Sequence, residues 1–574
     1  MMGSSFGEAL RAARRAAFEE AVRFLKEVRF AQVRDRRWAG RIGTAQHGVE
    51  IELPEDFPDT LPTVFLAEQP KGLRIAHVES NRKICLASES ATLVDAERVA
   101  DVIREALERA DAVLSDEAGH QRAEIQREFI GYWDGRNHGV VTICPPDCAT
   151  GEVHAVQFGG DAKLLVAADA TQAKAWLEAT GQPAGARQSG WLMRLDSFLP
   201  LPKPGKKLRL GEVLELLERE IPAADYAVTT AWLRRQALPA LIVFSSPIAG
   251  SGGRAVYGVM VPRPEDHGFR AGAMPGEVGL ARARGEPIVP VSVQRADPEF
   301  LLVRGGGVAR LREKTVLLAG CGSVGSHLAV ALSSMGVGRL VLVDPEALGF
   351  ENTHRHVLGA AQVGEKKADA LRTLLRQRFP HQVVDVHADT VEHVLERDER
   401  IFKEVDVVVL ALGAETIERR LSKLLATRVR VVHAWLEPLG VGGHVVASAV
   451  PGSAGCFCCL FRHDKDHGLV NQASLVEPNQ KFQRSLGGCA GSFTPFGVLD
   501  AQRVAIEAAR EVGRVLAWET HAQPRLTTWV GSKVDLVAAG VRLSPRGEAL
   551  QEGCLLAVAD FVRADCDACG SGHA

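Results

Sequence analysis

The sequence contains no long hydrophobic run. Its apolar stretches, such as residues 405–412, which Asp406 interrupts, are far too short to span a bilayer. Residues 8–15 (Glu-Ala-Leu-Arg-Ala-Ala-Arg-Arg) read as the charged start of a helix and lack the apolar core of a signal peptide. We therefore expect a cytoplasmic protein that does not act at a membrane.

An excess of charge of one sign is also missing. The 574 residues include 68 basic and 71 acidic side chains, so the net charge of −3 attracts neither nucleic acid nor a membrane surface. Internal repeats and low-complexity tracts are absent as well. The chain is long enough for two to four globular domains. Its 11 cysteines, in a reducing compartment, indicate thiol chemistry and metal binding rather than disulfides.

A glycine-rich turn is the most informative feature. A hydrophobic strand runs into Gly320, Gly322 and Gly325 and then into a helix, as in sites where backbone N–H groups approach a phosphate. The next strand, residues 339–343, ends at Asp344, which is placed to hold ribose hydroxyls. From about residue 300 strands and helices alternate, which predicts a parallel α/β sheet. A nucleotide-dependent oxidoreductase would show the same pattern.

Two cations favour making an acyl-adenylate over redox chemistry. Arg355 and Lys367 follow Asp344 and should lie near the ends of the strands, together with Asn352. A departing pyrophosphate needs positive charge there, and a dehydrogenase does not. Taken singly, each cation is an ordinary surface residue, but their order after the glycine turn favours a site.

Two Cys-x-x-Cys pairs indicate a metal. Cys456 and Cys459 form the first pair, and Cys566 and Cys569 form the second. Two such pairs can supply four thiolates to a tetrahedral zinc, which then has no open coordination position and is structural rather than catalytic. The alternative is that these are four buried apolar cysteines. Cys458 is a bystander or a substitute ligand.

One further cysteine stands apart from these pairs. Cys489 lies in the glycine-rich stretch 486–492, before a helix at 497–510. A thiol near a helix start can be an activated nucleophile, and the alternative is an inconsequential loop cysteine.

The first half of the chain carries fewer chemical signals. Short strands are predicted at 38–42, 49–53 and 63–67, with a helix at about 96–115. Residues 150–300 mix strands and helices without a chemical motif, which is typical of a spacer or docking domain. We predict three domains, comprising residues 1–140, 141–299 and 300–574.

The last of these domains resembles the ThiF/MoeB-type adenylation domain, the core of ubiquitin-activating enzymes. The resemblance rests on the glycine turn, Asp344, the Asn352–Arg355 element, Val363-Gly-x-x-Lys367-Ala and the paired cysteines. It implies a Rossmann-like fold, ATP and Mg²⁺, a structural Zn²⁺, a thioester on Cys489 and a homodimer. The family's acidic Mg²⁺ residue aligns with Gly413, and Glu415 is the alternative ligand.

The first domain resembles ubiquitin-conjugating enzymes, which implies an α+β fold. Asn81-Arg-Lys-Ile-Cys85-Leu86 is similar to their active-site segment, with Cys85 as the cysteine that carries the thioester. The family's His-Pro-Asn triplet is missing. His77 lies where its asparagine would fall, so it either polarises the thioester carbonyl, steers the amine or is structural.

The order of domains resembles the bacterial fusion enzymes of CBASS anti-phage operons. That resemblance implies ATP-dependent activation of a protein C-terminus, of a cGAS-like nucleotidyltransferase or a ubiquitin-like protein, and its transfer through Cys489 and Cys85 to target amines. Three alternatives stay open. They are a sulfur-carrier or peptide-modifying adenylating enzyme with a non-catalytic N-terminal domain, a nucleotide-dependent oxidoreductase, and a catalytically dead scaffold.

Overall fold

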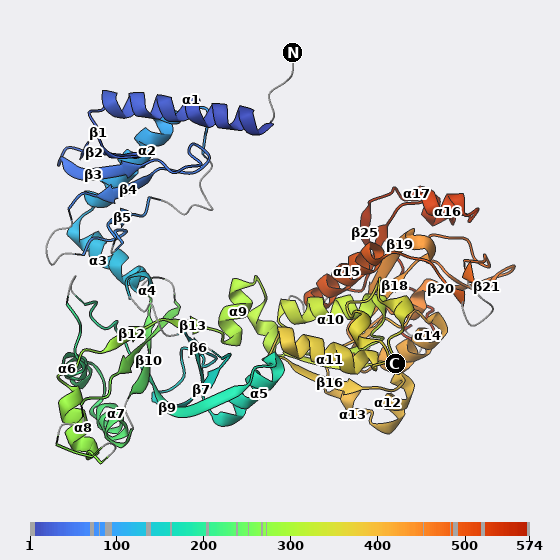
Figure 1. Ribbon diagram of the computed structural model, residues 1–574. Coiled ribbons are helices and arrows are strands. Elements are labelled where there is room, and N and C mark those ends of the chain that lie inside the picture. The colour runs from blue at the N-terminus through green and yellow to red at the C-terminus, as the bar shows by residue number, and fades with distance from the viewer. Residues whose placement is uncertain are drawn as a thin grey trace. The chain divides into compact units, whose positions relative to one another are not determined.

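The structure of the chain is a computed structural model (Figure 1). It describes residues 6–570, apart from 69–73, 80, 87–93, 134–138, 161–162, 203–205, 237–238, 249, 251, 266–267, 271–272, 452, 483, 486–491 and 518–522. The chain divides into two compact units, formed by Met1–Ala173 with Ala184–Ala296 and by Lys174–Pro183 with Asp297–Ala574. The first unit contains two sheets, and the second contains one large sheet and two small hairpins.

An antiparallel five-stranded sheet forms the N-terminal part of the first unit, in the order β1-β2-β3-β4-β5. Its strands are β1 (Ala31–Arg34), β2 (Arg37–Ile42), β3 (His47–Glu52), β4 (Thr63–Leu66) and β5 (Lys83–Ile84). Its helices are α1 (Phe6–Glu27), α2 (Val99–Leu114), α3 (Ala118–Arg127) and α4 (Phe129–Tyr132). Side chains alternate along β3, so Val49 and Ile51 are fully buried, in a core that includes Leu25 of α1 and Ile103 of α2.

A mixed eight-stranded sheet forms the rest of the first unit, in the order β12-β11-β10-β9-β7-β8-β6-β13. Its strands are β6 (Val140–Thr142), β7 (Gly151–Phe158), β8 (Lys163–Ala167), β9 (Ala184–Arg194), β10 (Ala240–Pro247), β11 (Arg254–Val261), β12 (Val289–Val291) and β13 (Val293–Arg295). Its helices are α6 (Leu210–Glu220), α7 (Ala223–Arg235) and α8 (Gly276–Ala283), while α5 (Ala170–Thr180), which lies between β8 and β9 in the chain, belongs from Lys174 onward to the second unit. Leu214 of α6 and Trp232 of α7 pack with Phe244 and Tyr257 of the sheet. The predicted mixture of strands and helices is therefore one sheet with helices packed on it.

The second unit is built on an eight-stranded sheet, in the order β16-β15-β14-β17-β18-β19-β24-β25. Its strands are β14 (Thr315–Ala319), β15 (Arg339–Val343), β16 (Val383–His387), β17 (Val407–Leu410), β18 (Arg430–Leu436), β19 (Gly442–Ala447), β24 (Arg525–Val530) and β25 (Leu555–Val558). The first five in this order are parallel, which confirms the predicted parallel sheet. The antiparallel extension by β19, β24 and β25 was not part of that prediction.

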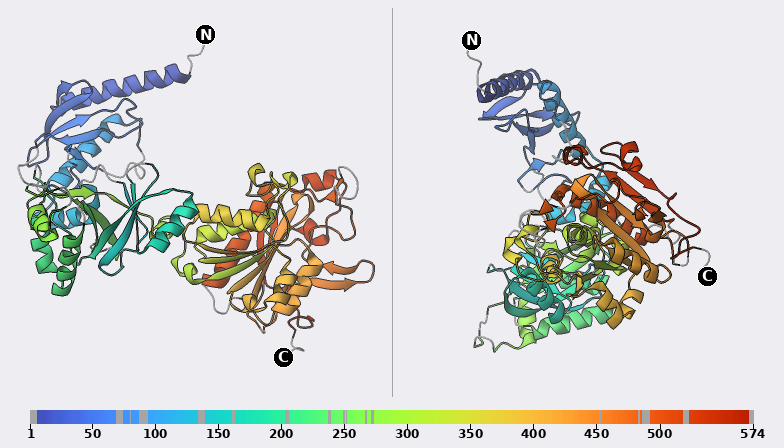
Figure 2. Two further views of the ribbon diagram at one scale, coloured as in Figure 1. Left: turned by 60° about the horizontal axis from the view of Figure 1, so that its bottom comes forward. Right: turned by 90° about the vertical axis from the view of Figure 1, so that its right-hand side faces the viewer.

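Helices cover both faces of this sheet (Figure 2). On one face lie α10 (Ser323–Met335), α11 (Lys367–Arg378) and α15 (Val498–Ala517). On the other lie α12 (Val391–Arg397), α13 (Arg400–Lys403) and α14 (Glu415–Leu425). Residues facing the two sides alternate along β14, where Leu318 packs with α10 and Leu317 packs with α14. The sheet is therefore buried on both faces, and the carboxyl ends of its parallel strands lie along one edge.

Short elements complete the second unit. They are α9 (Pro298–Arg304), η2 (Ala309–Glu313), η3 (Phe350–Asn352), η4 (Ala360–Gln362), η5 (Pro438–Gly440), η6 (Phe457–Leu460), α16 (Val534–Ala538), α17 (Pro545–Ala549) and the hairpins β20 (Phe461–Asp464) with β21 (Gly468–Asn471) and β22 (Arg484–Ser485) with β23 (Ser492–Phe493). Within the residues that the structure describes, no helix is both long and apolar enough to cross a membrane.

Candidate functional site

The glycine turn joins β14 to α10 in a conformation that other residues would not tolerate. Gly320 has φ +91°, and a Cβ there would overlap the carbonyl oxygen of Ala411. A Cβ at Gly325 would overlap the carbonyl oxygen of Gly320. By contrast, a Cβ at Gly322 would meet no described atom within 4 Å. The first and third glycines therefore let the turn close, while the second borders open space at the start of a 13-residue helix.

Asp344 connects the end of β15 to this turn. Its side chain is buried, and Oδ2 accepts a 2.7 Å hydrogen bond from the N–H of Cys321. Oδ1 accepts a 2.8 Å bond from the N–H of Glu346. Burial raises the pKa of Asp344, while these two backbone donors act in the opposite direction. Each oxygen keeps a second lone pair, so the carboxylate can still accept from ribose hydroxyls.

Lys367 begins α11 beside Asp344 and has a buried side chain. The charge of Lys367 acts to lower the pKa of Asp344, against the larger effect of burial, which raises it. Lys367 Nζ forms an ion pair with Glu346 Oε2, and the Glu346 side chain is 67% exposed. A solvated carboxylate gives up such a pair at little cost. The structure therefore leaves Lys367 able to exchange Glu346 for an anionic ligand.

Arg355 holds a donor without a partner. Its Nε is buried and has no hydrogen-bond partner among the described residues, and its guanidinium lies 5.0 Å from the centre of the Phe496 ring. Asn352 shapes the same loop, since its Oδ1 accepts a 3.0 Å bond from the N–H of Gly349 and its carbonyl accepts from the N–H of Arg355. A buried, unsatisfied guanidinium N–H is costly and suits a phosphate oxygen.

His356, which the sequence reading missed, supports the glycine turn. Its Nδ1 accepts a 3.0 Å hydrogen bond from the N–H of Leu358, so Nε2 carries the proton and donates at 2.7 Å to the carbonyl oxygen of Cys321. Burial lowers the pKa of His356 to about 4, and burial also lowers that of His327. A neutral imidazole therefore ties the loop after Arg355 to the turn. Its position directly after Arg355 was the only available signal.

The turn after β17 holds Gly413 where the resemblance implies an acidic Mg²⁺ ligand. Gly413 has φ +65° and, as a glycine, offers no carboxylate. Glu415, the alternative, is exposed, and its Oε1 accepts a 2.7 Å hydrogen bond from Asn471 Nδ2. Partial desolvation of its carboxyl group raises the pKa of Glu415, as does its neighbour Glu437. The described residues therefore do not assign a protein ligand for Mg²⁺ at this position.

The four cysteines of the two Cys-x-x-Cys pairs come together. The thiols of Cys456, Cys459, Cys566 and Cys569 all lie within 4.8 Å of one another. Cys458 lies outside this group, because its thiol donates to the carbonyl of Arg419 at 3.4 Å. Four thiols in this arrangement fit a tetrahedral metal with a closed shell.

In the N-terminal part of the first unit, Cys85 is exposed and follows β5. Its N–H donates to the carbonyl of His77, and Val78 and Ile84 form a β-bridge between them. The two predicted site residues therefore lie on paired segments.

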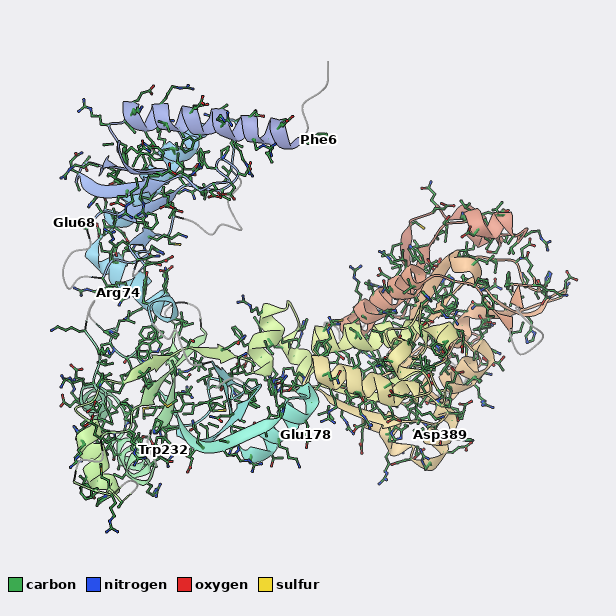
Figure 3. All side chains as sticks on the ribbon, viewed as in Figure 1. Phe6, Glu68, Arg74, Glu178, Trp232 and Asp389 are labelled. Carbon is green, nitrogen blue, oxygen red and sulfur yellow. The ribbon has the colours of Figure 1, made fainter. Side chains whose placement is uncertain are left out.

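The imidazole of His77 lies among groups from the α3–α4 region. Nδ1 lies 3.0 Å from Glu128 Oε1, and Nε2 lies 3.7 Å from Glu124 Oε2. The N–H of His77 donates at 2.6 Å to the hydroxyl of Tyr132, which donates in turn to Glu128. Arg74, labelled in Figure 3, lies over the Tyr132 ring. Burial raises the pKa of Tyr132, so it remains a neutral donor.

Cys489 lies outside the described residues, so its predicted role as a nucleophile stays a prediction. The strands that flank it in sequence, β22 and β23, pair antiparallel. After β23 the carbonyl of Pro495 accepts a hydrogen bond from the N–H of Leu439, and the ring of Phe496 lies against Arg355.

Family models match two parts of the chain. Residues 22–140 match prokaryotic E2 family B, a range that includes His77 and Cys85. Residues 297–510 match the ThiF family, a range that includes the glycine turn, Arg355 and Cys489. The chain therefore joins an E2-type segment to a ThiF-type segment, which confirms the predicted fusion and its fold class.

Curated relatives have both long and partial matches. The ATP-dependent ubiquitin transferase-like protein Cap2 of Vibrio cholerae is 22% identical over 81% of this chain and 84% of its own length. The Cap2 protein of Escherichia coli is 24% identical over 36% of each chain. The uncharacterized protein y4oA of Sinorhizobium fredii is 28% identical over 42% of each. The last two matches thus span about two fifths of the relatives' length.

Escherichia coli MccB with ATP is among the solved structures to which the chain is similar. That structure shares 15% identity over 63% of this chain and 88% of its own, with a TM-score of 0.34. The tRNA N6-threonylcarbamoyladenosine dehydratase TcdA of Escherichia coli shares 24% identity over 23% of this chain and 56% of its own, with a TM-score of 0.21.

Proposed function

We propose that this chain, a fusion of an E2-type and a ThiF-type segment, is an ATP-dependent ligation enzyme that activates the C-terminus of a protein partner. The observation that carries the proposal is the open glycine turn bordered by Asp344, Lys367 and Arg355, whose Nε has no partner among the described residues. The relative from Vibrio cholerae, which matches along most of the chain, supports the same activity.

The first step forms an acyl-adenylate above the glycine turn. A carboxylate oxygen of the partner's C-terminus attacks the α-phosphorus of ATP, a C(O)–O–P linkage forms, and the bond to pyrophosphate breaks. Asp344 holds the ribose, the turn accepts phosphate oxygens at its N–H groups, and Arg355 and Lys367 balance the charge that builds on pyrophosphate. Mg²⁺ neutralises phosphate charge when bound, and no residue of the turn after β17 is assigned to it.

Two thiols then carry the acyl group. Cys489 attacks the adenylate carbonyl, so that a C–S bond forms and AMP leaves. The thiol of Cys85 displaces Cys489 in a second exchange, in which one thioester replaces another and each acyl transfer starts from an activated carbonyl. A target amine finally attacks that carbonyl, the C–S bond breaks, and the amine's proton leaves as the Cys85 thiol is restored.

The finer assignments follow from the resemblance to CBASS-type fusions. The acyl partner is a cGAS-like nucleotidyltransferase or a ubiquitin-like protein, and the reaction primes anti-phage defence in the cytoplasm. The enzyme acts as a homodimer, and zinc on the four-cysteine group stabilises the ThiF-type segment. The chain differs from the activating enzymes at Gly413 and from the conjugating enzymes in lacking the His-Pro-Asn triplet. The nucleotide site and the thioester site therefore need separate tests.

ATP–pyrophosphate exchange with candidate partners tests the adenylation step. The full chain should exchange radiolabel only when a partner with a free C-terminal carboxylate is present, and Asp344→Ala should lose the signal while keeping its melting temperature within a few degrees. Pyrophosphate exchange by Asp344→Ala at the rate of the wild type would overturn the assignment of Asp344 to the nucleotide site. Exchange without any thioester on Cys85 would indicate the alternative of an adenylating enzyme with a non-catalytic N-terminal domain.

A further inference from the structure

The turn formed by residues 411–413 is a wall of the nucleotide site made of backbone. The carbonyl oxygen of Ala411 lies so close to Gly320 that a Cβ there would overlap it, and the N–H of Ala411 donates at 2.9 Å to the carbonyl of Ala319. A Cβ at Gly413 would meet no described atom within 4 Å, so the turn has open space on that side. The path of this backbone therefore determines where the glycine turn lies.

A buried carboxylate holds this wall from behind. Glu418, in the first turns of α14, is 2% exposed, and its Oε1 accepts hydrogen bonds from the N–H groups of Leu412 at 3.1 Å and Gly413 at 3.0 Å. Charged acceptors make the stronger hydrogen bonds, and both donors lie in one short turn. One oxygen atom therefore fixes two consecutive peptide units of the wall.

The second oxygen of Glu418 is satisfied by an equally buried histidine. Oε2 lies 2.8 Å from Nδ1 of His433, which is 0% exposed in β18 and stacks on Phe457 with ring centres 4.0 Å apart. Nε2 of His433 has no hydrogen-bond partner among the described residues. Nδ1 thus carries the proton and donates it to Oε2, so that Oε1 is left to accept from the two N–H groups of the wall.

From this geometry, and resting on the proposed function, we propose that Glu418 is a positioning residue for ATP, which acts through the 411–413 turn with His433 completing its bonds. Gly413 has no side chain to offer a phosphate, so in this proposal the position of the backbone takes over the role of the carboxylate that the resemblance implies there. A small displacement of a binding loop can greatly weaken the affinity for a nucleotide, because contacts to phosphate need close alignment.

Titration calorimetry of the full chain with ATP, and the kinetics of pyrophosphate exchange, test the inference. Glu418→Ala should weaken ATP binding about tenfold and raise the KM for ATP accordingly, since two backbone donors lose their acceptor. Glu418→Gln should bind ATP within about threefold of the wild type. Its amide oxygen can accept from both N–H groups, and its NH₂ can donate to Nδ1 once His433 moves its proton to Nε2.

Glu511→Ala is the matched control. Glu511 is 6% exposed in α15 and bonds to Arg514 and Thr527, so its loss should lower the melting temperature while the Kd for ATP stays within about twofold. If Glu418→Ala does not fold, a Kd for Glu418→Gln that is more than tenfold weaker would overturn the inference. ATP binding by Glu418→Ala within twofold of the wild type would also overturn it. Wild-type protein that binds no ATP would overturn the proposed function itself, and the inference with it.

Discussion

The backbone N–H of Cys85 donates a 2.7 Å hydrogen bond to the carbonyl oxygen of His77. The other side of His77 is held by the α3–α4 region, through the Tyr132 hydroxyl and the Glu128 carboxylate. A chain of short contacts therefore runs from these helices to the segment that carries the exposed thiol. This relation gives His77 a defined position beside Cys85 without the triplet found in the family.

The first prediction concerns His77. His77→Ala should slow discharge of the Cys85 thioester onto free lysine by about tenfold or more, because we expect the imidazole, on the segment that pairs with Cys85, to act in proton transfer or in orienting the amine. Loading of Cys85 should be nearly unchanged. Glu128→Gln should show a smaller decrease, and Glu105→Gln, an exposed change on α2, should show none. Pulse-chase gels with ATP removed after loading measure the rate. Equal discharge by His77→Ala and wild type would leave His77 a structural role only.

The four-cysteine group gives a second prediction. Cys566→Ser should release one zinc per chain and lower the melting temperature by roughly 10 °C, because metal binding here contributes directly to folding. Cys458→Ser is the control, since that thiol bonds to the carbonyl of Arg419 and lies outside the group. It should keep its zinc. Elemental analysis and thermal melts decide the matter, and wild-type protein without metal would contradict the assignment.

Arg355 provides the third prediction. Arg355→Ala should lower partner-dependent pyrophosphate exchange about 100-fold, as expected when one donor to a developing anion is lost. Arg355→Lys should recover only a small part of the lost exchange activity, because lysine lacks the planar guanidinium that lies over Phe496. Arg397→Ala removes an exposed ion pair with Asp389 and should exchange normally. Wild-type exchange in Arg355→Ala would remove it from the site.

A pH dependence follows from His356. The pKa of His356 is about 4 in the folded protein, below the value of about 6.5 expected for an unfolded histidine. Between these pH values the unfolded chain therefore binds a proton that the folded protein does not. The stability that His356 contributes is complete above about pH 6.5 and is lost as the pH falls toward 4. Between pH 7 and pH 5 the wild type should therefore lose about 2 kcal/mol more stability than His356→Gln, a variant that keeps a donor and an acceptor but does not titrate.

Denaturant unfolding at pH 7 and pH 5 measures this difference. The exposed change His463→Gln serves as the control and should follow the wild-type pH dependence. A His356→Gln variant that loses as much stability as the wild type between these pH values would show that the imidazole does not titrate as the structure implies.

Local patterns in the sequence were enough to predict the parallel sheet and the glycine turn between β14 and α10. The strand–helix alternation and the spacing from Gly320 to Asp344 involve neighbours in the chain, and the structure joins their ends through the Cys321 N–H. The antiparallel extension was missed, because pairing such as Val445 with Thr527 connects segments far apart in sequence and has no local signature.

The same limit applies to the polar contacts behind the site. A carboxylate in α14 and a histidine in β18 look like ordinary surface and strand residues until folding places Glu418 Oε2 2.8 Å from His433 Nδ1. His356 was not predicted for a related reason. Both of its hydrogen bonds are made to backbone atoms, so the pattern of residue types along the sequence does not indicate them. Residue types predict chemistry, whereas burial and partners come only with the fold.

The last prediction distinguishes a two-thiol relay from a single adenylating enzyme. Cys489→Ala should still form the acyl-adenylate but place no thioester on either cysteine, because adenylation needs neither thiol and loading of Cys85 needs both. Cys85→Ala should instead trap the partner on Cys489 as a species that reducing agent releases, and no amide product should form. Cys554→Ala, a half-buried cysteine outside the proposed site, should behave as wild type on the same non-reducing gels. Because Cys85 is exposed, its loss should cost little stability, so a missing product would reflect chemistry rather than unfolding. Amide product from Cys85→Ala would end the relay and leave the N-terminal domain a role in recognition alone.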